Sequence, residues 1–325
     1  MKLGIVGNGM IVHTALDALQ HISDITLEAI CVRPNSLEKG LQLKDDYSIK
    51  KVFTSYEEFL NDADIDFVYI GIINSLHFDY AYQALMAGKN VILEKPMCPD
   101  YDSTYKLSCL AIEKNLFLFE AVTFLHASFF KEIQSLLPRI GNVKLVQCNF
   151  SKYSSRYSDY IKGIVHPVFD PQQYGGTLLD INVYNINFVA ALLGLPRQVH
   201  YYANHGANGV DTSGILLLEY DGFIASCASA KDSSSPGFMM IQGDKGYMAV
   251  YGNPNHLEML EVSLEDTFYK KDLRDTKNRM IDEFEDFLHI YQQRDWQKMK
   301  HYLDISIMVS QIISDARQGN ILPHC

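Results

Sequence analysis

The chain has 325 residues, of which 47% are hydrophobic and 21% charged, and its formal net charge is −11. This length suits two domains of ordinary size, and the composition is that of a globular chain and not a disordered one. The acidic balance argues against nucleic acid as a main partner. No apolar run reaches the roughly 18–20 residues that cross a bilayer, so we expect no membrane segment.

The N-terminus and the cysteines favour the cytoplasm. The opening MKLGIVGNGM is interrupted by glycines and lacks a small-residue cleavage site, so it is not typical of a signal peptide. The six cysteines include no C-x-x-C pair, which indicates structural thiols in a reducing compartment. The eleven histidines include no H-x-x-x-H or H-E-x-x-H spacing, so we expect no metal site.

Residues 1–122 alternate short apolar runs with helical patterns. Strands are expected at 2–7, 26–32, 66–72, 90–96 and 116–122, and helices at 10–21, from Ser55 onward, at 77–88 and at about 100–114. Ser55 and Glu58 have the S-x-x-E spacing that starts a helix. Apolar strands that alternate with helices predict a parallel sheet covered on both faces, a doubly wound α/β domain of Rossmann type.

Residues 123–325 follow another pattern, which is typical of an α+β domain built on a mainly antiparallel open sheet. Helices are expected at about 126–138, 178–193, 277–294 and 296–318, and strands at 143–150, 198–205, 213–222, 223–230, 238–243 and 247–252. Turn signals lie between some of these strands, as in antiparallel hairpins. The sequence therefore predicts two domains, 1–122 for a dinucleotide and 123–325 for a substrate.

A glycine turn follows the first strand. Gly7 and Gly9 stand where a backbone must bend tightly and approach a pyrophosphate, and the main chain of Met10 and Ile11 opens the next helix. Val12 occupies the third glycine position of G-x-G-x-x-G, so the fingerprint is incomplete. The turn predicts dinucleotide binding, and a tight turn in a domain that binds something else is the alternative.

The end of the second strand favours NADP over NAD. It offers Arg33, with Asn35, Ser36 and Lys39 close behind, and a cation with such donors suits a 2′-phosphate. Glu28 has roughly the spacing of an acid that binds a ribose but lies at the start of its strand. An arginine stacked on the adenine would allow either cofactor.

Charged and polar side chains follow two further strands. Glu94 and Lys95 end one strand, and Asn74 and His77 follow another. Ligands of open parallel sheets bind beyond the carboxyl ends of the strands, so these residues should converge near the glycine turn. A solvated loop is the alternative for Glu94 and Lys95.

In the second half, Asp180 and Tyr184 stand four residues apart in an expected helix, after two glycines. That spacing places both on one helical face, and an acid with a phenol suits proton transfer. A helix face with a half-buried tyrosine is the plainer interpretation. Tyr153, Tyr157 and Tyr160 lie in a loop where they either stack on a sugar ring or pack the loop.

The motifs together resemble the Gfo/Idh/MocA oxidoreductases over nearly the whole chain. The resemblance rests on G-x-G at 7–9, INSLHFDYAYQALMAGKNVILEKP at 73–96 and GGTLLDINVY at 175–184. It implies a two-domain NAD(P)-dependent enzyme for sugars, polyols and related hydroxyl compounds, and a homo-oligomer, a dimer or higher. FEAVTF, IGNVKLVQCNFSKY and VFDPQQYGGTLLDINVY are similar to the dihydrodiol and xylose dehydrogenase branch.

The resemblance implies roles for residues of the first half. Lys95 corresponds to the catalytic lysine, with Glu94 beside it, and Asn74 and His77 match a segment that borders the cofactor. Ile73 departs from the family, because a proline commonly stands there.

Residues of the second half acquire roles in the same way. Asp180 and Tyr184 match an Asp-x-x-x-Tyr pair at the substrate. Tyr174 replaces a usual glycine, and Pro167 stands where the branch often has arginine, with His166 adjacent as the best remaining candidate for substrate contact.

These roles imply hydride transfer between a secondary alcohol carbon and the nicotinamide. Tyr184 would exchange the hydroxyl proton, Lys95 would hold the substrate oxygen and lower the pKa of the phenol, and Asp180 would orient the substrate or the lysine. The roles of Lys95 and Tyr184 are interchangeable on sequence grounds. The rival hypothesis is a non-catalytic NAD(P)-binding regulator, which has no need of this proton-transfer set.

Overall fold

The computed structural model describes residues 1–61, 64–254, 256–274 and 277–319. The chain forms two compact units. The first consists of Met1–Cys98, Asp102–Thr123 and Lys277–Ser306, and the second of Pro99–Tyr101, Phe124–Thr276 and Ile307–Cys325.

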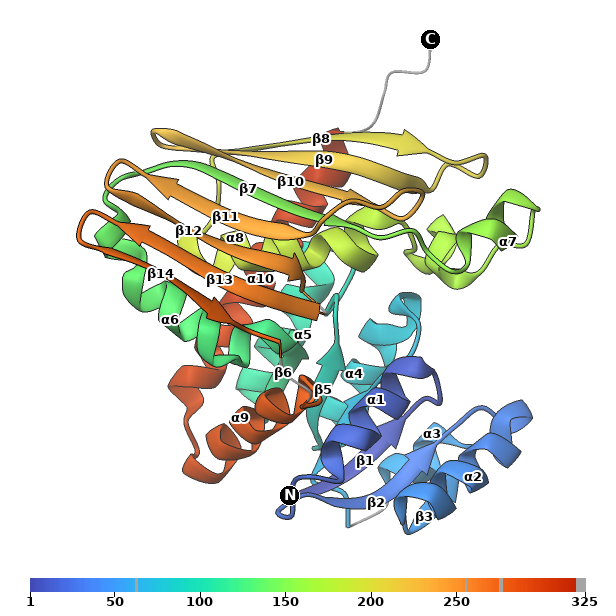
Figure 1. Ribbon diagram of the computed structural model, residues 1–325. Helices are drawn as coiled ribbons and strands as arrows, with labels where there is room; N and C mark the ends of the chain where they lie inside the picture. Colours follow the sequence, from blue (N-terminus) through green and yellow to red (C-terminus); the bar gives the residue numbers. More distant parts are fainter. Residues whose placement is uncertain (62–63, 255, 275–276, 320–325) are drawn as a thin grey trace. The chain divides into compact units, whose positions relative to one another are not determined.

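A six-stranded parallel sheet is the centre of the first unit (Figure 1). Its strands lie in the order β3-β2-β1-β4-β5-β6, so the strand order reverses between β1 and β4. The strands are β1 (Lys2–Val6), β2 (Thr26–Cys31), β3 (Lys51–Phe53), β4 (Phe67–Ile70), β5 (Asn90–Glu94) and β6 (Leu118–Ala121). The helices are α1 (Met10–Leu19), α2 (Leu37–Tyr47), α3 (Tyr56–Leu60), α4 (His77–Met86), α5 (Tyr101–Glu113) and α9 (Met280–Gln293). The predicted parallel α/β sheet is thus confirmed.

The predicted helix start at Ser55 is also confirmed. Its hydroxyl accepts a hydrogen bond of 3.3 Å from the main-chain N–H of Glu58, which caps α3.

Helix α9 packs on the sheet of the first unit, which corrects the predicted domain of 123–325. The ring of Phe287 stacks on Phe119 with centroids 4.5 Å apart, and Phe284 meets Tyr69 edge to face at 5.7 Å. All four rings are fully buried. These buried aromatic contacts join α9 to the first unit, although α9 follows the strands of the second unit in the sequence. Residues 277–306 therefore belong to the first unit.

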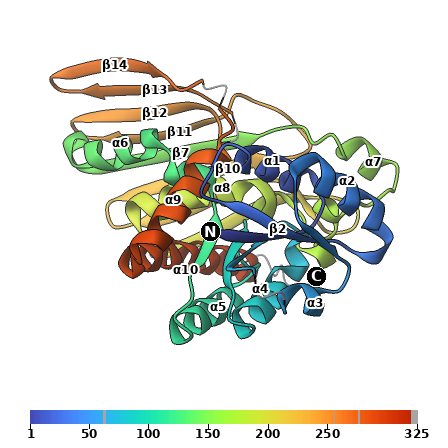
Figure 2. The same ribbon diagram turned by 90° about the horizontal axis from the view of Figure 1, so that it is seen from below.

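The second unit contains an eight-stranded sheet in the order β14-β13-β12-β11-β7-β10-β9-β8. Its neighbours are antiparallel except for the parallel pair β7 and β10, and Figure 2 shows β14, β13, β12 and β11 side by side. The strands are β7 (Val143–Ser151), β8 (Gln198–His205), β9 (Asp211–Tyr220), β10 (Phe223–Ala230), β11 (Phe238–Gly243), β12 (Gly246–Asn253), β13 (His256–Leu264) and β14 (Thr267–Asp272). This mainly antiparallel sheet confirms the predicted α+β class, and β13 and β14 add two strands that the sequence did not predict.

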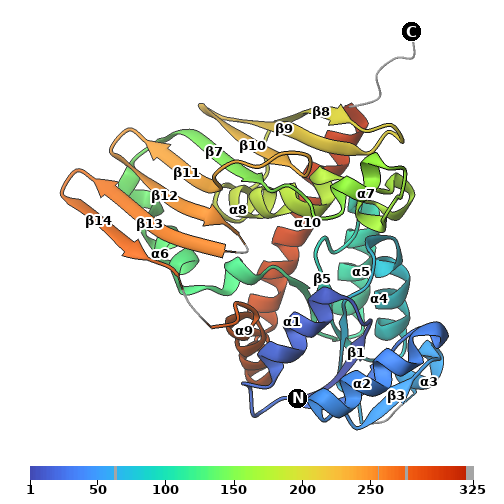
Figure 3. The ribbon, with the colours of Figure 1, turned by 45° about the vertical axis from the view of Figure 1, so that its right-hand side comes forward.

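Within the described ranges, helices cover one face of this sheet. Figures 1 and 3 show α6 (Ser128–Leu136) and α8 (Val183–Leu193) on the same side. Helix α7 (Tyr157–Ile161) follows β7, and α10 (Trp296–Gly319) ends the described chain. The opposite face of the sheet carries exposed side chains.

Among the described residues, one segment is by length and composition apolar enough to cross a membrane, contrary to the expectation from the sequence. Pro171–Leu193 reaches a mean hydropathy of 1.3, and 72% of that window is buried within the protein. A core helix packed under a sheet has these properties.

Candidate active site

The turn between β1 and α1 has the geometry of an anion-binding loop. Gly7 has φ of 111°, and a Cβ there would collide with the carbonyl oxygen of Gly71, so the position requires glycine. Gly9 directly precedes α1, and apart from its chain neighbours no atom of the described residues lies within 4 Å of where its Cβ would be. The start of α1 thus adjoins open space beside a residue without a side chain, and the N-terminus of a helix is a favourable place for an anion.

The incomplete glycine fingerprint has a structural explanation. Val12 is fully buried, and a Cβ on Gly71 would lie only 2.9 Å from its Cγ2. Gly71, which follows β4, thus provides the close approach of helix to sheet that the third glycine of the motif usually gives. Met10 starts α1 with its side chain 75% exposed, and Ile11 packs partly buried against the core.

Arg33, which follows β2, is exposed, whereas Glu28, which lies within β2, is not available to a ligand. Glu28 is buried, and its Oε1 accepts hydrogen bonds from Lys50 Nζ at 2.7 Å and from Thr26 Oγ1 at 3.1 Å. Arg33 directly precedes the short 3-10 helix Pro34–Ser36 with its side chain in solvent. The end of β2 consequently presents a cation and no acid.

His77 lies in the segment after β4 that is predicted to border the cofactor, and its ring lies between two main-chain carbonyl oxygens. His77 is fully buried, with Nδ1 2.8 Å from the carbonyl oxygen of Pro96 and Nε2 3.2 Å from that of Ile72. Burial lowers the pKa of His77, which favours the neutral imidazole. The ring ties together the segments that follow β4 and β5. Asn74, at the start of the 3-10 helix Asn74–Leu76, is half-buried.

Glu94 and Lys95 end β5 in a constrained segment. Glu94 is 5% exposed, its Oε1 accepts a hydrogen bond from Tyr69 Oη at 2.9 Å, and its Oε2 one from the main-chain N–H of Lys95 at 3.3 Å. Burial raises the pKa of Glu94, and the adjacent Lys95 opposes that rise. The peptide bond from Lys95 to Pro96 is cis. The alternative of a solvated loop is wrong for Glu94.

The parallel sheet brings the sequence-predicted residues of the first unit to one edge. Gly7, Asn74 and Lys95 directly follow β1, β4 and β5, or lie a few residues beyond them, and these strands are neighbours in the sheet. The reversal between β1 and β4 creates the crevice in which open α/β sheets bind their ligands.

In the second unit, Asp180 lies in a π-helical turn. The predicted helix 178–193 begins with this turn at Leu178–Asn182 and continues as α8, where Tyr184 is 6% exposed and meets Phe150 edge to face at 5.8 Å. Isolated π turns inside α-helices are frequent at functional sites.

A half-buried acid that the sequence did not indicate anchors the π turn. Asp211 Oδ2 accepts hydrogen bonds of 2.7 Å from the main-chain N–H of Leu178 and from Tyr201 Oη. Gly176 has φ of 108°, and a Cβ there would collide with Oδ1 of Asp211, so this glycine lets the chain pass against the acid. Burial raises the pKa of Asp211.

Lys231 is a second residue that the sequence did not indicate. Its side chain is 3% exposed, and its Nζ lies 2.7 Å from Oδ2 of Asp180 and 2.8 Å from the carbonyl oxygen of Val168. The same ammonium lies 4.5 Å from the ring centroid of Phe169. Asp180, itself partly exposed, is therefore held in an ion pair with a buried lysine.

The loop before Asp180 contains the remaining candidates. His166 Nε2 lies 2.9 Å from Oδ2 of Asp159, and both side chains are partly exposed. Pro167 starts the 3-10 helix Pro167–Phe169. Tyr174 takes a left-handed conformation with φ of 53°, and the guanidinium of Arg317 lies 5.3 Å from the centroid of its ring.

The tyrosines of this loop pack on one another. Tyr157 and Tyr160 lie with ring centroids 5.6 Å and 5.0 Å from that of Phe169, and Tyr153 meets Tyr157 edge to face at 5.5 Å. Of the two alternatives for these tyrosines, packing of the loop is the one observed.

Comparison with known proteins supports the resemblance. Residues 1–122 match the model described as oxidoreductase family, NAD-binding Rossmann fold, and residues 133–249 match the GFO/IDH/MocA C-terminal domain. The chain is 28% identical to scyllo-inositol 2-dehydrogenase (NADP(+)) IolU of Bacillus subtilis (strain 168) over 98% of this chain and 96% of that protein. It is 31% identical to the uncharacterized oxidoreductase YgjR of Escherichia coli (strain K12) over 77% of this chain and 76% of that one.

Two further proteins are similar to the chain. Trans-1,2-dihydrobenzene-1,2-diol dehydrogenase of Xenopus laevis is 30% identical over 77% of this chain and 74% of its own. The crystal structure of KijD10, a 3-ketoreductase from Actinomadura kijaniata in complex with NADP and TDP-benzene, covers 98% of this chain and 97% of its own with a TM-score of 0.85 and 20% identity, which shows the same fold. The motifs, the two domain matches and these relatives agree: the chain belongs to the Gfo/Idh/MocA family of oxidoreductases.

Proposed function

We propose that the protein is an NADP-preferring dehydrogenase or reductase, with a cyclic polyol, sugar or dihydrodiol-like compound as its substrate. The observation that carries the proposal is the placement of the Gly7–Gly9 turn and Lys95 beyond one edge of the parallel sheet, where the strand order reverses. The named activities of the inositol and dihydrodiol dehydrogenases agree with this substrate class.

The residues of the first unit fit a dinucleotide. The open space beside Gly9 admits a pyrophosphate to the amides of α1, and exposed Arg33 suits a 2′-phosphate. The bound nicotinamide would supply or accept the hydride. NAD is the alternative cofactor. Titration of the protein with both nucleotides would show which of them binds more tightly.

Three residues would manage the substrate oxygen and its proton. Lys95 would place a positive charge on the oxygen, Tyr184 would exchange the proton, and Asp180 would accept a hydrogen bond from a neighbouring hydroxyl. Lys95 and Tyr184 could exchange these roles. The pH profiles of turnover for Lys95→Met and Tyr184→Phe would identify the proton carrier, since only its removal abolishes the corresponding limb.

A substrate panel tests the activity. Initial rates with NADP⁺ and NAD⁺ are measured on scyllo-inositol, myo-inositol, xylose, glucose and a trans-dihydrodiol, alongside fluorescence titration with NADPH. We expect turnover on at least one cyclic polyol or sugar, faster with NADP⁺. Tight NADPH binding without turnover on any compound would instead support a non-catalytic regulator.

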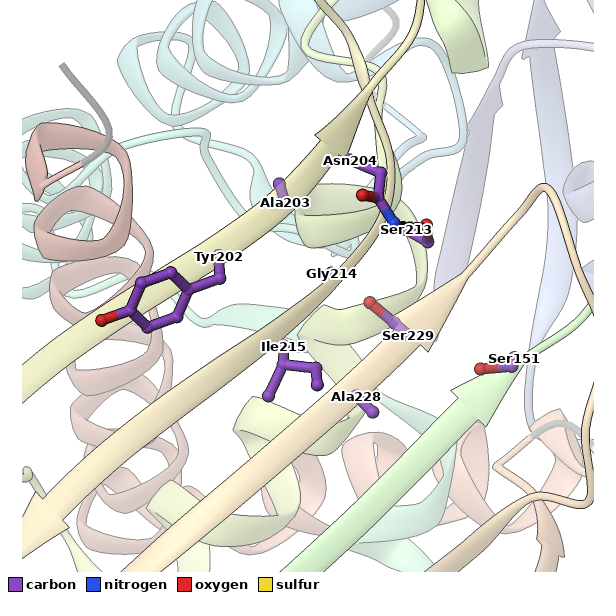
Figure 4. A pocket seen from close by; sticks show the side chains of 9 residues that line it. All are labelled: Ser151, Tyr202, Ala203, Asn204, Ser213, Gly214, Ile215, Ala228 and Ser229. Atoms are coloured by element: carbon purple, nitrogen blue, oxygen red, sulfur yellow. Dashed lines mark hydrogen bonds between the residues drawn. The ribbon is translucent and has the colours of Figure 1, made fainter. Parts of the chain in front are cut away.

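We further propose that the uncovered face of the second sheet is a homodimer contact. Tyr202, Ile215, Ile224 and Phe268 are 66%, 48%, 50% and 63% exposed there. Figure 4 shows a depression on this sheet lined by Tyr202, Ala203, Asn204, Ser213, Gly214, Ile215, Ala228, Ser229 and Ser151. Large exposed apolar side chains on one sheet face are typical of protein interfaces. Light scattering after size exclusion should give a dimer for the native chain and a monomer for Ile215→Lys, and a monomeric native chain would contradict the proposal.

A cytoplasmic location is likewise a proposal. Five cysteines within the described ranges are free thiols, and four of them are buried, which suits a reducing compartment. Cys325 lies outside the described residues. Cell fractionation tests this location, and recovery in a secreted fraction would contradict it.

A further inference from the structure

We infer that Lys231 is a positioning residue of the substrate site, which holds Asp180 as an ionised carboxylate in one orientation. Asp180 then serves as a fixed hydrogen-bond acceptor and not as a proton carrier. The inference rests on the proposed function, because that proposal places Asp180 at the substrate.

The contacts of the Lys231 ammonium leave it fully surrounded by protein. Two of its three N–H groups have oxygen acceptors, Oδ2 of Asp180 at 2.7 Å and the carbonyl oxygen of Val168 at 2.8 Å. The ring of Phe169, with its centroid 4.5 Å away, lies beside the same ammonium as a cation–π partner. With 3% of its side chain exposed, Lys231 has almost no contact with water. A lysine buried to this degree keeps its charge only when a paired carboxylate offsets the lost hydration.

The main chain of Lys231 is equally constrained. Its N–H donates to the carbonyl oxygen of Thr212 at 2.8 Å, and its own carbonyl oxygen accepts from the N–H of Ser154 at 2.8 Å. These bonds tie the end of β10 to β9 and to the segment after β7. The main chain that carries the Lys231 side chain is therefore held in place, and the position of the ammonium fixes that of the Asp180 carboxylate.

The other charged groups around Lys231 have partners of their own. Asp211 interacts with Lys231 electrostatically, but its Oδ2 is occupied by Leu178 and Tyr201. Asp232, the next residue, accepts hydrogen bonds from Thr212 Oγ1 at 2.7 Å and Ser213 Oγ at 3.0 Å.

His166 and Asp159, on the loop before Val168, pair with each other at 2.9 Å. The direct ion pair of Lys231 is consequently with Asp180.

Two consequences follow for the substrate. The side chain of Asp180 is 28% exposed, so the ion pair leaves part of this side chain accessible. Because one ammonium binds both Asp180 and Val168, the π turn and the loop that carries His166 are joined in a single arrangement. Lys231 thereby influences which substrates fit, although it does not contact them.

The activity test compares Lys231→Met, Lys231→Gln, Asp180→Asn and the double variant Lys231→Met/Asp180→Asn. We expect Lys231→Met to lower kcat/KM about tenfold or more at pH 7, with the Kd of NADPH unchanged within about twofold. The acidic limb of the kcat/KM profile should move up by about one to three pH units, because Asp180 loses the cation that keeps it ionised. A purely structural role would leave that limb in place, and an unmoved limb overturns the inference.

A second, activity-independent readout is the double-mutant cycle in thermal unfolding. Lys231→Met should lower Tm less in the Asp180→Asn background than in the native chain. Its deficit should also narrow from pH 8 to pH 5, as the unpaired Asp180 takes up a proton. Additive changes in Tm, or a deficit independent of pH, overturn the inference. Lys231→Gln, a neutral hydrogen-bond donor, takes the place of Lys231→Met if the latter does not fold.

Lys271→Met is the matched control, since Lys271 Nζ also lies 2.7 Å from its partner Glu132 but is 46% exposed. Lys271→Met should leave the acidic limb of the kcat/KM profile in place, and it should show little coupling to its partner Glu132 in thermal unfolding. Coupling without turnover on any substrate would overturn the proposed function alone, and turnover without coupling would overturn the role of Lys231 alone.

Discussion

The phenol of Tyr69 donates a hydrogen bond of 2.9 Å to Oε1 of Glu94, the residue immediately before Lys95. The other oxygen of Glu94 accepts from the main-chain N–H of Lys95 at 3.3 Å. Hydrogen bonds thus hold both carboxyl oxygens of Glu94 inside the sheet, and one of them fixes the main chain of Lys95. Nearby, Glu120 Oε1 accepts a hydrogen bond of 2.8 Å from the N–H of Met97, so a second buried acid fixes the segment after the cis bond.

Removal of the Tyr69 hydroxyl should destabilise the first unit. In Tyr69→Phe, a buried carboxyl oxygen loses its donor, which costs about 1–3 kcal/mol in the free energy of unfolding. Urea unfolding at pH 7 measures the change. Tyr47→Phe removes a hydrogen bond of 2.6 Å to Asp17 in an exposed setting and should cost less. Equal losses in the two variants would contradict the clamped position of Glu94.

Replacement of Lys95 should abolish turnover and spare cofactor binding. Lys95→Met removes the positive charge proposed to hold the substrate oxygen, and we expect kcat to fall by about a factor of 10² or more. Initial rates and NADPH titration separate the two effects. Lys106→Met, a change at an exposed lysine of α5, is the control. Near-native turnover in Lys95→Met would refute the assignment.

Glu283 should make stability fall as pH rises. It is fully buried, neither of its carboxyl oxygens has a hydrogen-bond partner among the described residues, and burial together with Glu94 and Glu120 raises its pKa well above 4.5, while Arg279 opposes the rise. Because the folded state binds this proton more tightly than the unfolded state, its contribution is complete below about pH 4.5 and is lost above it.

The variant Glu283→Gln tests this sign. This variant has no carboxyl group to titrate, so its free energy of unfolding relative to the native chain should increase from pH 5 to pH 8. The increase should be about 1.4 kcal/mol for each pH unit that lies below the pKa of Glu283 in the folded state. Urea midpoints at the two pH values provide the measurement. A difference that does not change with pH would show that Glu283 is not protonated in the folded state.

Arg33 should distinguish the two cofactors. Arg33→Ala removes the proposed charge-assisted contact to a 2′-phosphate, so the Kd of NADP⁺ should rise about tenfold while that of NAD⁺ stays within about twofold. Isothermal titration with both nucleotides provides the data. Lys39→Ala, at another exposed cation nearby, should have the smaller effect. If both nucleotides weaken equally, Arg33 stacks on the adenine and carries no preference.

Much of the fold was predictable because its signals are local. The strands β1, β4 and β5 are continuous apolar runs, and Ser55 caps its helix through Glu58, three residues away. The three-residue strand β3 is too short for a periodic signal. Helix α9 was recognised but assigned to the wrong unit, since an amphipathic pattern does not state which sheet it covers.

The candidate site divides in the same way. Lys95 and Asp180 were predicted from motifs, whereas Lys231 was missed although it closes β10 as Lys95 closes β5. Its partner Asp180 is 51 residues upstream, and no local spacing links them. His77 was predicted to border the cofactor from its motif, which does not reveal that its ring is fully buried.

The π turn at Leu178–Asn182 carries Asp180 and separates it from α8, which packs in the core. Downstream, Val183 and Phe188 of α8 are locked in the core. Upstream, Asp180 takes its direction from Lys231. Loss of one residue in this turn would restore α-helical winding and rotate Asp180 by about 100° around the helix axis, away from Lys231. If Asp180 contacts the substrate as proposed, a single deletion in this turn would therefore change substrate preference, at a packing cost confined to the buried Leu178, Leu179 and Asn182 of the turn.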